Sequence, residues 1–373
     1  MFDVLLSVII SFTITFLAIP AIMTVAERKK LFDVPDERKI HQTPIPSLGG
    51  LGIFAGFILA CLITAPFQAS AEFQYFFAAA IVIFFLGLKD DILVISPIKK
   101  FIGQVLAAFL IIYKGEVQIT SMHGFMGIYE LPEMFSLLLT YFTVIVIVNS
   151  FNLIDGVDGL AGSLGVMSSL LFGFYFLQVN MASYAILAFA LTGSLTAFLI
   201  FNYQPAKIFM GDTGSMLIGL ITSILVVKFI NVSQIPGINM PIDASPAIGF
   251  TILMIPLLDT LRVFGIRIFH RRSPFSPDRN HVHHLLLDRG LSHRSITTIL
   301  VSINLFFILA AYLGRNVGCT WLIISITGIF FTGIAALYYT RQPRLFVAKA
   351  SLTEINAKKI VSLTKDTILE HKN

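Results

Sequence analysis

The sequence predicts an all-α, polytopic integral membrane protein with about eleven transmembrane helices. Of its 373 residues, 56% are hydrophobic and only 13% are charged, whereas a soluble domain carries about 25% charged residues. The hydrophobic residues form eleven continuous runs, and about 20 apolar residues cross a bilayer once. The runs do not alternate in polarity, so they are helices rather than transmembrane β-strands.

The first run lacks the basic start of a cleaved signal peptide and is followed by the basic residues 28–30. We therefore expect it to remain as a span with the N-terminus outside. The fourth run is short, and the eighth contains Lys228, which is costly within lipid. In chain order the runs cover residues 2–26, 48–66, 73–88, 101–113, 131–148, 160–177, 184–201, 216–230, 246–265, 297–313 and 320–339.

Basic residues are distributed asymmetrically between the two sides. We assign the loops in turn to the two sides of the membrane, with the loop after the first run on the inside. The inside segments then hold 22 of the 26 lysines and arginines, and the outside loops hold only Lys114 and Arg315. Cytoplasmic loops of membrane proteins show this excess, which accounts for the net charge of +5 without nucleic-acid binding. The pattern predicts one membrane domain, 1–340, and a basic cytoplasmic tail, 341–373. The two cysteines, Cys61 and Cys319, do not suggest a disulfide framework.

Polar residues suited to chemistry gather in the inside loops, at the ends of the runs. An Asp pair follows the third run, an Asn- and Asp-rich loop follows the fifth, a Gly-Asp-Thr-Gly-Ser turn follows the seventh, and an Arg- and His-rich loop follows the ninth. The outside loops contain nothing comparable. The candidate residues are Asp90, Asp91, Asn149, Asn152, Asp155, Asp158, Asp212, Arg271, Arg272, Arg279, His281, His283 and His284.

Each segment allows a structural and a functional interpretation. Asp90 and Asp91 are either a solvated edge or a like-charged pair that needs a cation or a shared proton. Asn149, Asn152 and Asp155 are three residues apart and share one helical face, although a helix cap with an Asx turn explains one or two of them. Asp212 lies either in a simple turn or beside helix N-terminal N–H groups that could bind phosphate.

The histidines do not favour a zinc site, because no cysteine lies near them and the acidic partners supply hard oxygen ligands. Mg²⁺ or Mn²⁺ suits those ligands better, and the neighbouring arginines favour a phosphorylated ligand. Asp259 and Arg262 lie one helical turn apart, so we expect a mutual ion pair. His293 and the remaining histidines are treated as ordinary.

These parts are typical of phosphoryl transfer at the cytoplasmic membrane surface, where positioning and charge neutralisation do most of the catalysis. The main alternative is an ion-coupled carrier. Carriers place ionisable residues near the bilayer midplane on broken helices, whereas the acids here lie at helix ends.

The segments 38–50, 90–91, 149–162, 209–215 and 273–284 resemble, in order and spacing, the successive motifs of the polyprenyl-phosphate N-acetylhexosamine-1-phosphate transferases. The resemblance covers about residues 1–340. The last segment, Ser-Pro-Phe-Ser-Pro-Asp-Arg-Asn-His-Val-His-His, is similar to the undecaprenyl-phosphate GlcNAc-1-phosphate transferases. It is less similar to the phospho-MurNAc-pentapeptide translocases, which remain the alternative within the family.

The resemblance implies transfer of N-acetylhexosamine-1-phosphate, most plausibly GlcNAc-1-phosphate, from a UDP-N-acetylhexosamine to undecaprenyl phosphate, with release of UMP. It implies the first membrane step of cell-envelope polysaccharide synthesis, in the cytoplasmic (inner) membrane of a bacterium with the active site facing the cytoplasm. It also implies a requirement for Mg²⁺ (or Mn²⁺), and homodimers are common among relatives.

Carried over by motif, Asp212 and Asn152 would bind the metal, and the catalytic set would be Asp90, Asp91, Asp155 and Asp158. The Asp pair would orient the lipid phosphate, and the other two would hold the nucleotide-sugar or its loops. The substrate-binding residues would be Lys100, Asn149, Arg271, Arg272, Arg279, His281, His283 and His284. One departure is Val94, where many relatives carry an acid or a lysine.

Overall fold

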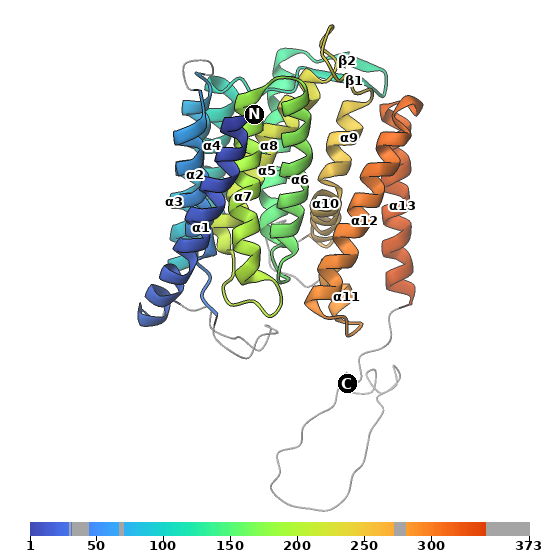
Figure 1. Ribbon diagram of the computed structural model, residues 1–373. Helices are drawn as coiled ribbons and strands as arrows, with labels where there is room; N and C mark the ends of the chain where they lie inside the picture. Colours follow the sequence, from blue (N-terminus) through green and yellow to red (C-terminus); the bar gives the residue numbers. More distant parts are fainter. Residues whose placement is uncertain (30, 32–44, 67–70, 272–280, 341–373) are drawn as a thin grey trace, which may run out of the picture.

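A computed structural model describes residues 1–29, 31, 45–66, 71–271 and 281–340 of the chain. The described part is a bundle of long, roughly parallel helices with one small hairpin at one end (Figure 1). Its helices are α1 (Phe2–Lys29), α2 (Gly49–Thr64), α3 (Phe73–Ile92), α4 (Pro97–Phe109), α5 (Glu133–Ile154), α6 (Leu160–Gln178), α7 (Ala182–Asn202), α8 (Gly211–Val232), α9 (Ser245–Ile252), α10 (Met254–Phe269), α11 (Val282–Leu287), α12 (His293–Leu313) and α13 (Cys319–Tyr339). A π-helical turn (Leu110–Lys114) extends α4, and a 3-10 turn (Arg315–Val317) precedes α13.

Every apolar run predicted from the sequence contains a helix. Within the described ranges, seven helices are long and apolar enough to cross a membrane by themselves, and α9 with α10 forms an eighth, bent candidate. The protein is therefore a polytopic, mainly α-helical membrane protein, as predicted. Helices α2 and α4 are shorter than 18 residues.

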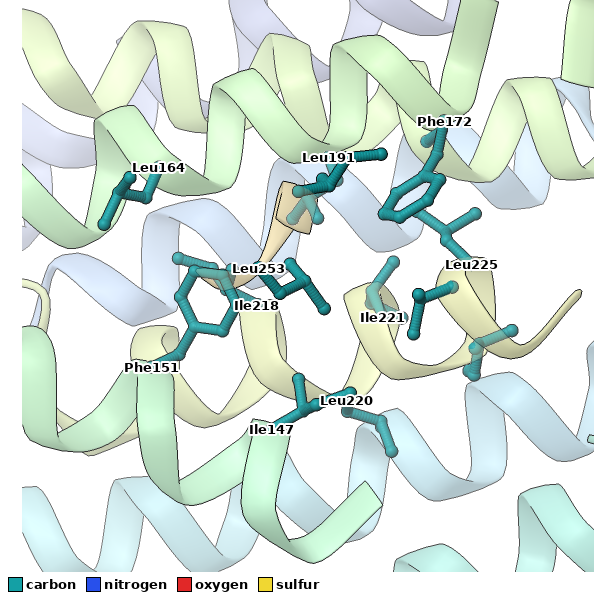
Figure 2. Packing of buried hydrophobic residues seen from close by; sticks show 14 of the residues in the cluster. Ile147, Phe151, Leu164, Phe172, Leu191, Ile218, Leu220, Ile221, Leu225 and Leu253 are labelled. Atoms are coloured by element: carbon teal, nitrogen blue, oxygen red, sulfur yellow. The ribbon is translucent and has the colours of Figure 1, made fainter. Parts of the chain in front are cut away.

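The core of the bundle is α8. In its most apolar stretch of 18 residues, 89% of the residues are buried, whereas only 22% are buried in the corresponding stretch of α13. Figure 2 shows how side chains of α8 such as Ile218 and Leu225 pack against Phe151 of α5, Phe172 of α6 and Leu191 of α7. This close packing lets a residue at the end of α8 take a fixed position relative to its neighbours.

Glycines bring two neighbouring helices into backbone contact with α8. A Cβ atom added at Gly87 of α3 would lie 2.5 Å from the Cα of Thr213, and one added at Gly219 of α8 would lie 2.5 Å from the Cα of Val148 in α5. Small residues at such crossings allow close approach of helices in membranes. The polar ends of α3 and α5 are thereby held against the start of α8.

The ninth run is broken rather than continuous, because α9 and α10 meet at an angle of 81°. Figure 1 shows α10 almost end-on between upright neighbours. The side chain of Asn304 in α12 supports the break: its Oδ1 accepts the N–H of Ile255 at 3.2 Å, and its Nδ2 donates to the Ile252 carbonyl at 3.1 Å. Backbone groups freed by a break inside a membrane protein need such partners.

The all-α prediction misses one small sheet. Strands β1 (Ser121–Phe125) and β2 (Ile128–Glu130) form an antiparallel hairpin within the predicted outside loop. The hairpin is fastened to α13, since the Met126 N–H donates to Thr320 Oγ1 at 2.6 Å. Figure 1 places it at the opposite end of the bundle from α11.

Candidate active site

Four helices contribute polar side chains to one cluster at the end of the bundle away from the hairpin. Asp90 comes from the last turn of α3, Lys100 from the first turns of α4, Asn152 from the last turn of α5 and Asp212 from the first turn of α8. We call these four residues the cation cluster. They are separated by up to 122 residues in sequence, so only the packing of the four helices brings them together.

The Lys100 ammonium lies at the centre of the cation cluster. Its Nζ donates to Asn152 Oδ1 at 3.0 Å, lies 3.2 Å from Asp90 Oδ2 and contacts Asp212 Oδ2. Asn152 Nδ2 in turn donates to Asp212 Oδ1 at 2.6 Å and to Ser215 Oγ at 3.1 Å. The oxygens of three side chains therefore surround one positive charge.

This donor set fits a hard divalent cation. Two carboxylates and an amide oxygen converge on the point that the ammonium occupies, and Mg²⁺ prefers one or two carboxylates completed by substrate phosphates. The residues described here contain no cluster of three or more His, Cys, Asp or Glu side chains that would form a complete protein cage. A metal held by these oxygens would take its remaining ligands from water or from a bound phosphate.

Asp91 has a different position from its neighbour Asp90. Its carboxylate accepts the backbone N–H of Asp212 at 2.6 Å and of Thr213 at 3.1 Å, and the hydroxyl of Thr213 at 2.6 Å. It therefore caps the N-terminus of α8, where a negative charge is favourable. These N–H groups, considered above as a phosphate site, are already used by Asp91.

Gly211 permits the close approach of α3 to α8 at this cap. Its φ is +72°, and a Cβ there would lie 2.3 Å from the Ser47 carbonyl and 2.7 Å from Asp91 Oδ1. A larger residue would disturb both the backbone and the cap. The glycine and the carboxylate together hold Asp212 at the edge of the cation cluster.

A cavity of about 190 Å³ opens beside the cation cluster. Its lining includes the polar side chains of Asp90, Lys100 and Asn152 and the apolar side chains of Val94 and Phe264. It therefore offers charged groups and apolar surface to one ligand, as a lipid phosphate would require. Val94 is 95% exposed at this cavity.

Two further cavity residues were not singled out from the sequence. Gln104 of α4 is buried and accepts a hydrogen bond from Asn149 Nδ2 at 2.8 Å, which fixes Asn149 behind the cation cluster. Arg267 of α10 is buried with its guanidinium 5.7 Å from the ring of Phe264. A lone glutamine in an apolar run was a usable signal for Gln104, whereas Arg267 was counted only as part of the basic excess.

The two aspartates of the α5–α6 connection have unequal surroundings. Asp158 is buried: its Oδ1 lies 3.1 Å from His293 Nδ1, and its Oδ2 accepts the Ala206 N–H at 3.3 Å. His293 is therefore a buried partner of Asp158 rather than an ordinary histidine. The side chain of Asp155 lies nearer to the cation cluster, and burial, followed by the carboxylates of Asp212, Asp91 and Asp158, raises its pKa well above the usual range.

The histidine segment begins beside α10. The expected Asp259–Arg262 pair is confirmed, with Nη2 to Oδ1 at 2.8 Å, and His281 Nδ1 lies 2.9 Å from the other oxygen of the same carboxylate. His281 stacks on His283 with ring centroids 5.5 Å apart. Burial lowers the pKa of His283 to about 3, so this ring is neutral at physiological pH.

His283 connects this segment to the α5–α6 connection, since a Cβ at Gly156 would lie only 2.8 Å from its Nε2. His284 follows it with ring centroids 4.4 Å apart. Arg271 is exposed just after the end of α10 with φ of +56°. The predicted residues Arg272 and Arg279, and the tail 341–373, lie outside the described residues.

Fold and site together define a class of protein: a multi-helix membrane protein with hard oxygen ligands and cationic side chains at one end of its helices. Comparison with known proteins identifies the family. Residues 73–230 match the model of glycosyl transferase family 4.

Curated relatives extend this match over most of the chain. A Bacillus subtilis protein named probable undecaprenyl-phosphate N-acetylglucosaminyl 1-phosphate transferase is 30% identical over 90% of this chain and 92% of its own length. The decaprenyl-phosphate N-acetylglucosaminephosphotransferase of Mycobacterium tuberculosis H37Rv is 33% identical over 77% of this chain and 76% of its own. The undecaprenyl-phosphate alpha-N-acetylglucosaminyl 1-phosphate transferase of Yersinia pestis is 34% identical over 72% and 73%. The chain belongs to glycosyl transferase family 4, and the resemblance inferred from its motifs is confirmed.

Proposed function

We propose that this protein transfers GlcNAc-1-phosphate from UDP-GlcNAc to undecaprenyl phosphate and releases UMP, as the first membrane step of a cell-envelope polysaccharide. The three relatives above are all named for N-acetylglucosamine and a polyprenyl phosphate, which does not favour a phospho-MurNAc-pentapeptide translocase. The observation that carries the proposal is the cation cluster beside a cavity that is lined by both charged and apolar side chains.

In this reaction an oxygen of the lipid phosphate attacks the sugar-bearing phosphorus of the donor. A new P–O bond forms, the bond to UMP breaks, and UMP leaves with the electron pair. A phosphate monoester has a second pKa of about 6, so the nucleophile is already largely dianionic and needs orientation more than proton removal. Charge neutralisation is the main task, because carboxylates alone would repel both reactants.

The chain's residues divide this task. Asp212 and Asn152 would hold Mg²⁺ (or Mn²⁺), and Asp90 lies beside them around Lys100; the ion would supply positive charge against the phosphate oxygens. Lys100, released from the carboxylates, would bind a phosphate of the reactants. Arg267 at the cavity is a second cationic candidate for the lipid phosphate, and Asp155 would hold the nucleotide-sugar. Asp91 positions Asp212 through the cap of α8.

The proposal includes the membrane arrangement predicted from the sequence. Eleven spans with the N-terminus outside and the C-terminus in the cytoplasm would place the cation cluster at the cytoplasmic face of a bacterial inner membrane. The excess of lysine and arginine in the inside segments and the bacterial relatives support this orientation. Cysteine-accessibility labelling of single-cysteine variants near residues 90 and 212 in intact cells would test it, with labelling from outside as the contrary result.

The direct test uses purified protein in lipid nanodiscs, undecaprenyl phosphate, a panel of UDP-sugars, and Mg²⁺, Mn²⁺ or EDTA. We expect UMP release that requires the lipid and the metal and is fastest with UDP-GlcNAc. The Asp212→Asn variant should fold normally and lose at least a hundredfold in rate. Release without lipid, or no release with any donor together with substrate uptake into liposomes, would reject the transferase in favour of another activity.

A further inference from the structure

A fully buried carboxylate, Asp259 of α10, lies outside the cation cluster and has no role in the mechanism above. It accepts three donors: Arg262 Nη2 at 2.8 Å and the Val282 N–H at 3.0 Å on Oδ1, and His281 Nδ1 at 2.9 Å on Oδ2. A buried charge is costly unless it is paired and hydrogen-bonded. Two of these donors belong to the start of α11, more than 20 residues further along the chain.

The pairing with Arg262 does not by itself explain this geometry. Arg262 uses one carboxylate oxygen and also approaches the hydroxyl of Tyr338 in α13, at 3.4 Å. The second oxygen of Asp259 is directed at the His281 ring. The carboxylate therefore does more than balance the arginine, because it joins α10 to the first residue of the histidine segment.

The contact determines which nitrogen of His281 carries hydrogen. An ionised carboxylate only accepts hydrogen bonds, so Nδ1 of His281 must be the donor, and Nε2 is the ring nitrogen that remains for another partner. A neutral ring with its hydrogen on Nδ1 offers only a lone pair at Nε2, so Nε2 donates to a phosphate oxygen only when it carries hydrogen as well.

The position of His281 connects it to the rest of the site. Its ring stacks on His283 at 5.5 Å with an interplanar angle of 6°, and His283 abuts Gly156, the residue after Asp155. Any rotation of the His281 ring would therefore disturb both the α10 contact and the α5–α6 connection. A single hydrogen bond from His281 Nδ1 to Asp259 can thus hold the ring in place.

We propose that Asp259 is a positioning residue for the transfer reaction: by accepting the hydrogen on Nδ1 it fixes the orientation of His281, so that Nε2 meets the diphosphate of the nucleotide-sugar, to which it donates when the ring carries a second hydrogen. This inference rests on the proposed function for the identity of the ligand. It assigns Asp259 no contact with either reactant.

The test is a double-mutant cycle of Asp259→Asn and His281→Asn. Asparagine at 259 keeps an oxygen for Val282 and Arg262 but turns an NH₂ group toward His281 Nδ1, which requires the opposite tautomer. We expect each single variant to lose at least tenfold in kcat/KM for UDP-GlcNAc, with less than a twofold change in KM for undecaprenyl phosphate. Because Asp259 acts through His281, the double variant should be no less active, per folded molecule, than His281→Asn alone.

A double variant whose loss equals the product of the two single losses would overturn the proposal, since Asp259 would then act independently of His281. Thr192→Val is the matched control, because it removes a buried hydrogen bond to Ser169 between α6 and α7, at 2.7 Å. It should lower the melting temperature without changing either KM. This control separates loss of stability from loss of positioning.

A second measurement needs no Asp259 variant. In ¹⁵N-histidine NMR spectra of the wild-type protein, the His281 signal, assigned from its loss in His281→Asn, should show a protonated Nδ1. An Nε2–H tautomer would overturn the inference. Failure of the proposed function would appear separately, as absence of lipid-dependent UMP release by the wild type, and would leave the tautomer result standing.

Discussion

The adjacent acids Asp90 and Asp91 should give different variants although the sequence presents them as a pair. Asp91 makes three short contacts, all with the first turn of α8. Asp90 instead belongs to the cation cluster: its Oδ1 accepts the Ile95 N–H at 2.8 Å, its Oδ2 lies 3.2 Å from Lys100, and its carboxyl group interacts with that of Asp212. We predict that Asp91→Asn mainly reduces stability and metal affinity, and that Asp90→Asn mainly reduces turnover.

The magnitude follows from the cap of α8. Asparagine at 91 keeps one acceptor oxygen, loses the charge and turns an NH₂ group toward a donor N–H. A negative charge at a helix N-terminus contributes about 0.3–1 kcal/mol, and up to ~2 kcal/mol when partly buried. A hydrogen bond to a charged group contributes about 1.5–3 kcal/mol. Because burial of the Asp91 carboxylate offsets part of these contributions, the free energy of unfolding should fall by about 1–2 kcal/mol in Asp91→Asn and by less than ~1 kcal/mol in Asp90→Asn.

Three measurements on both variants in nanodiscs test this reasoning. Unfolding would be followed by thermal denaturation, metal affinity by Mn²⁺ electron paramagnetic resonance without substrate, and turnover by UMP release. Asp91→Asn should bind Mn²⁺ at least threefold more weakly, because the backbone that carries Asp212 is no longer held. An Asp91→Asn protein with wild-type stability and Mn²⁺ affinity but no turnover would refute the capping role and place Asp91 on the substrate.

Three further predictions concern other parts of the site. Lys100→Met should bind Mn²⁺ at least tenfold more tightly in the absence of substrate, because the ammonium no longer competes for Asp212 and Asn152. Its rate of UMP release should fall by at least a hundredfold. An unchanged Mn²⁺ affinity would contradict this prediction. In metal-free protein at neutral pH, Asp155→Asn should raise the melting temperature. The raised pKa of Asp155 means that ionisation of this carboxyl group favours the unfolded chain. The gain should therefore disappear as pH falls below the ordinary carboxyl range, where wild-type Asp155 is protonated in both the folded and the unfolded state; a gain that persists in acid would exclude this cause. Val94→Ser should raise KM for undecaprenyl phosphate about fivefold, the equivalent of ~1 kcal/mol of lost apolar contact, and leave KM for UDP-GlcNAc unchanged. Equal changes in the two KM values would show that Val94 does not contact the lipid substrate specifically.

The spans were predictable because lipid imposes a strong requirement on sequence: each crossing needs a continuous apolar run. The break between α9 and α10 was not, because residues 246–265 read as one apolar run. The groups that satisfy its backbone belong to Asn304, about 50 residues away. The hairpin at 121–130 was likewise hidden in a short loop without a strong strand signal.

The candidate site was predictable to the level of segments but not of individual roles. Asp90 and Asp91 are the same residue type at consecutive positions, so only the 100° turn between helical neighbours directs one to the cavity and the other to α8. His293 looked ordinary because its partner Asp158 is 135 residues away. Such pairings depend on tertiary packing, which local spacing does not contain.

The backbone contacts at Gly87 and Gly219 extend the sensitive region of this protein along the helices beyond the cation cluster. Because α3 and α5 touch α8 there without intervening side chains, one extra methyl group would push Asp90 or Asn152 away from Asp212. Substitutions that reduce the transfer activity or make it temperature-sensitive should therefore arise at these glycines between the helices, although neither glycine belongs to the cation cluster.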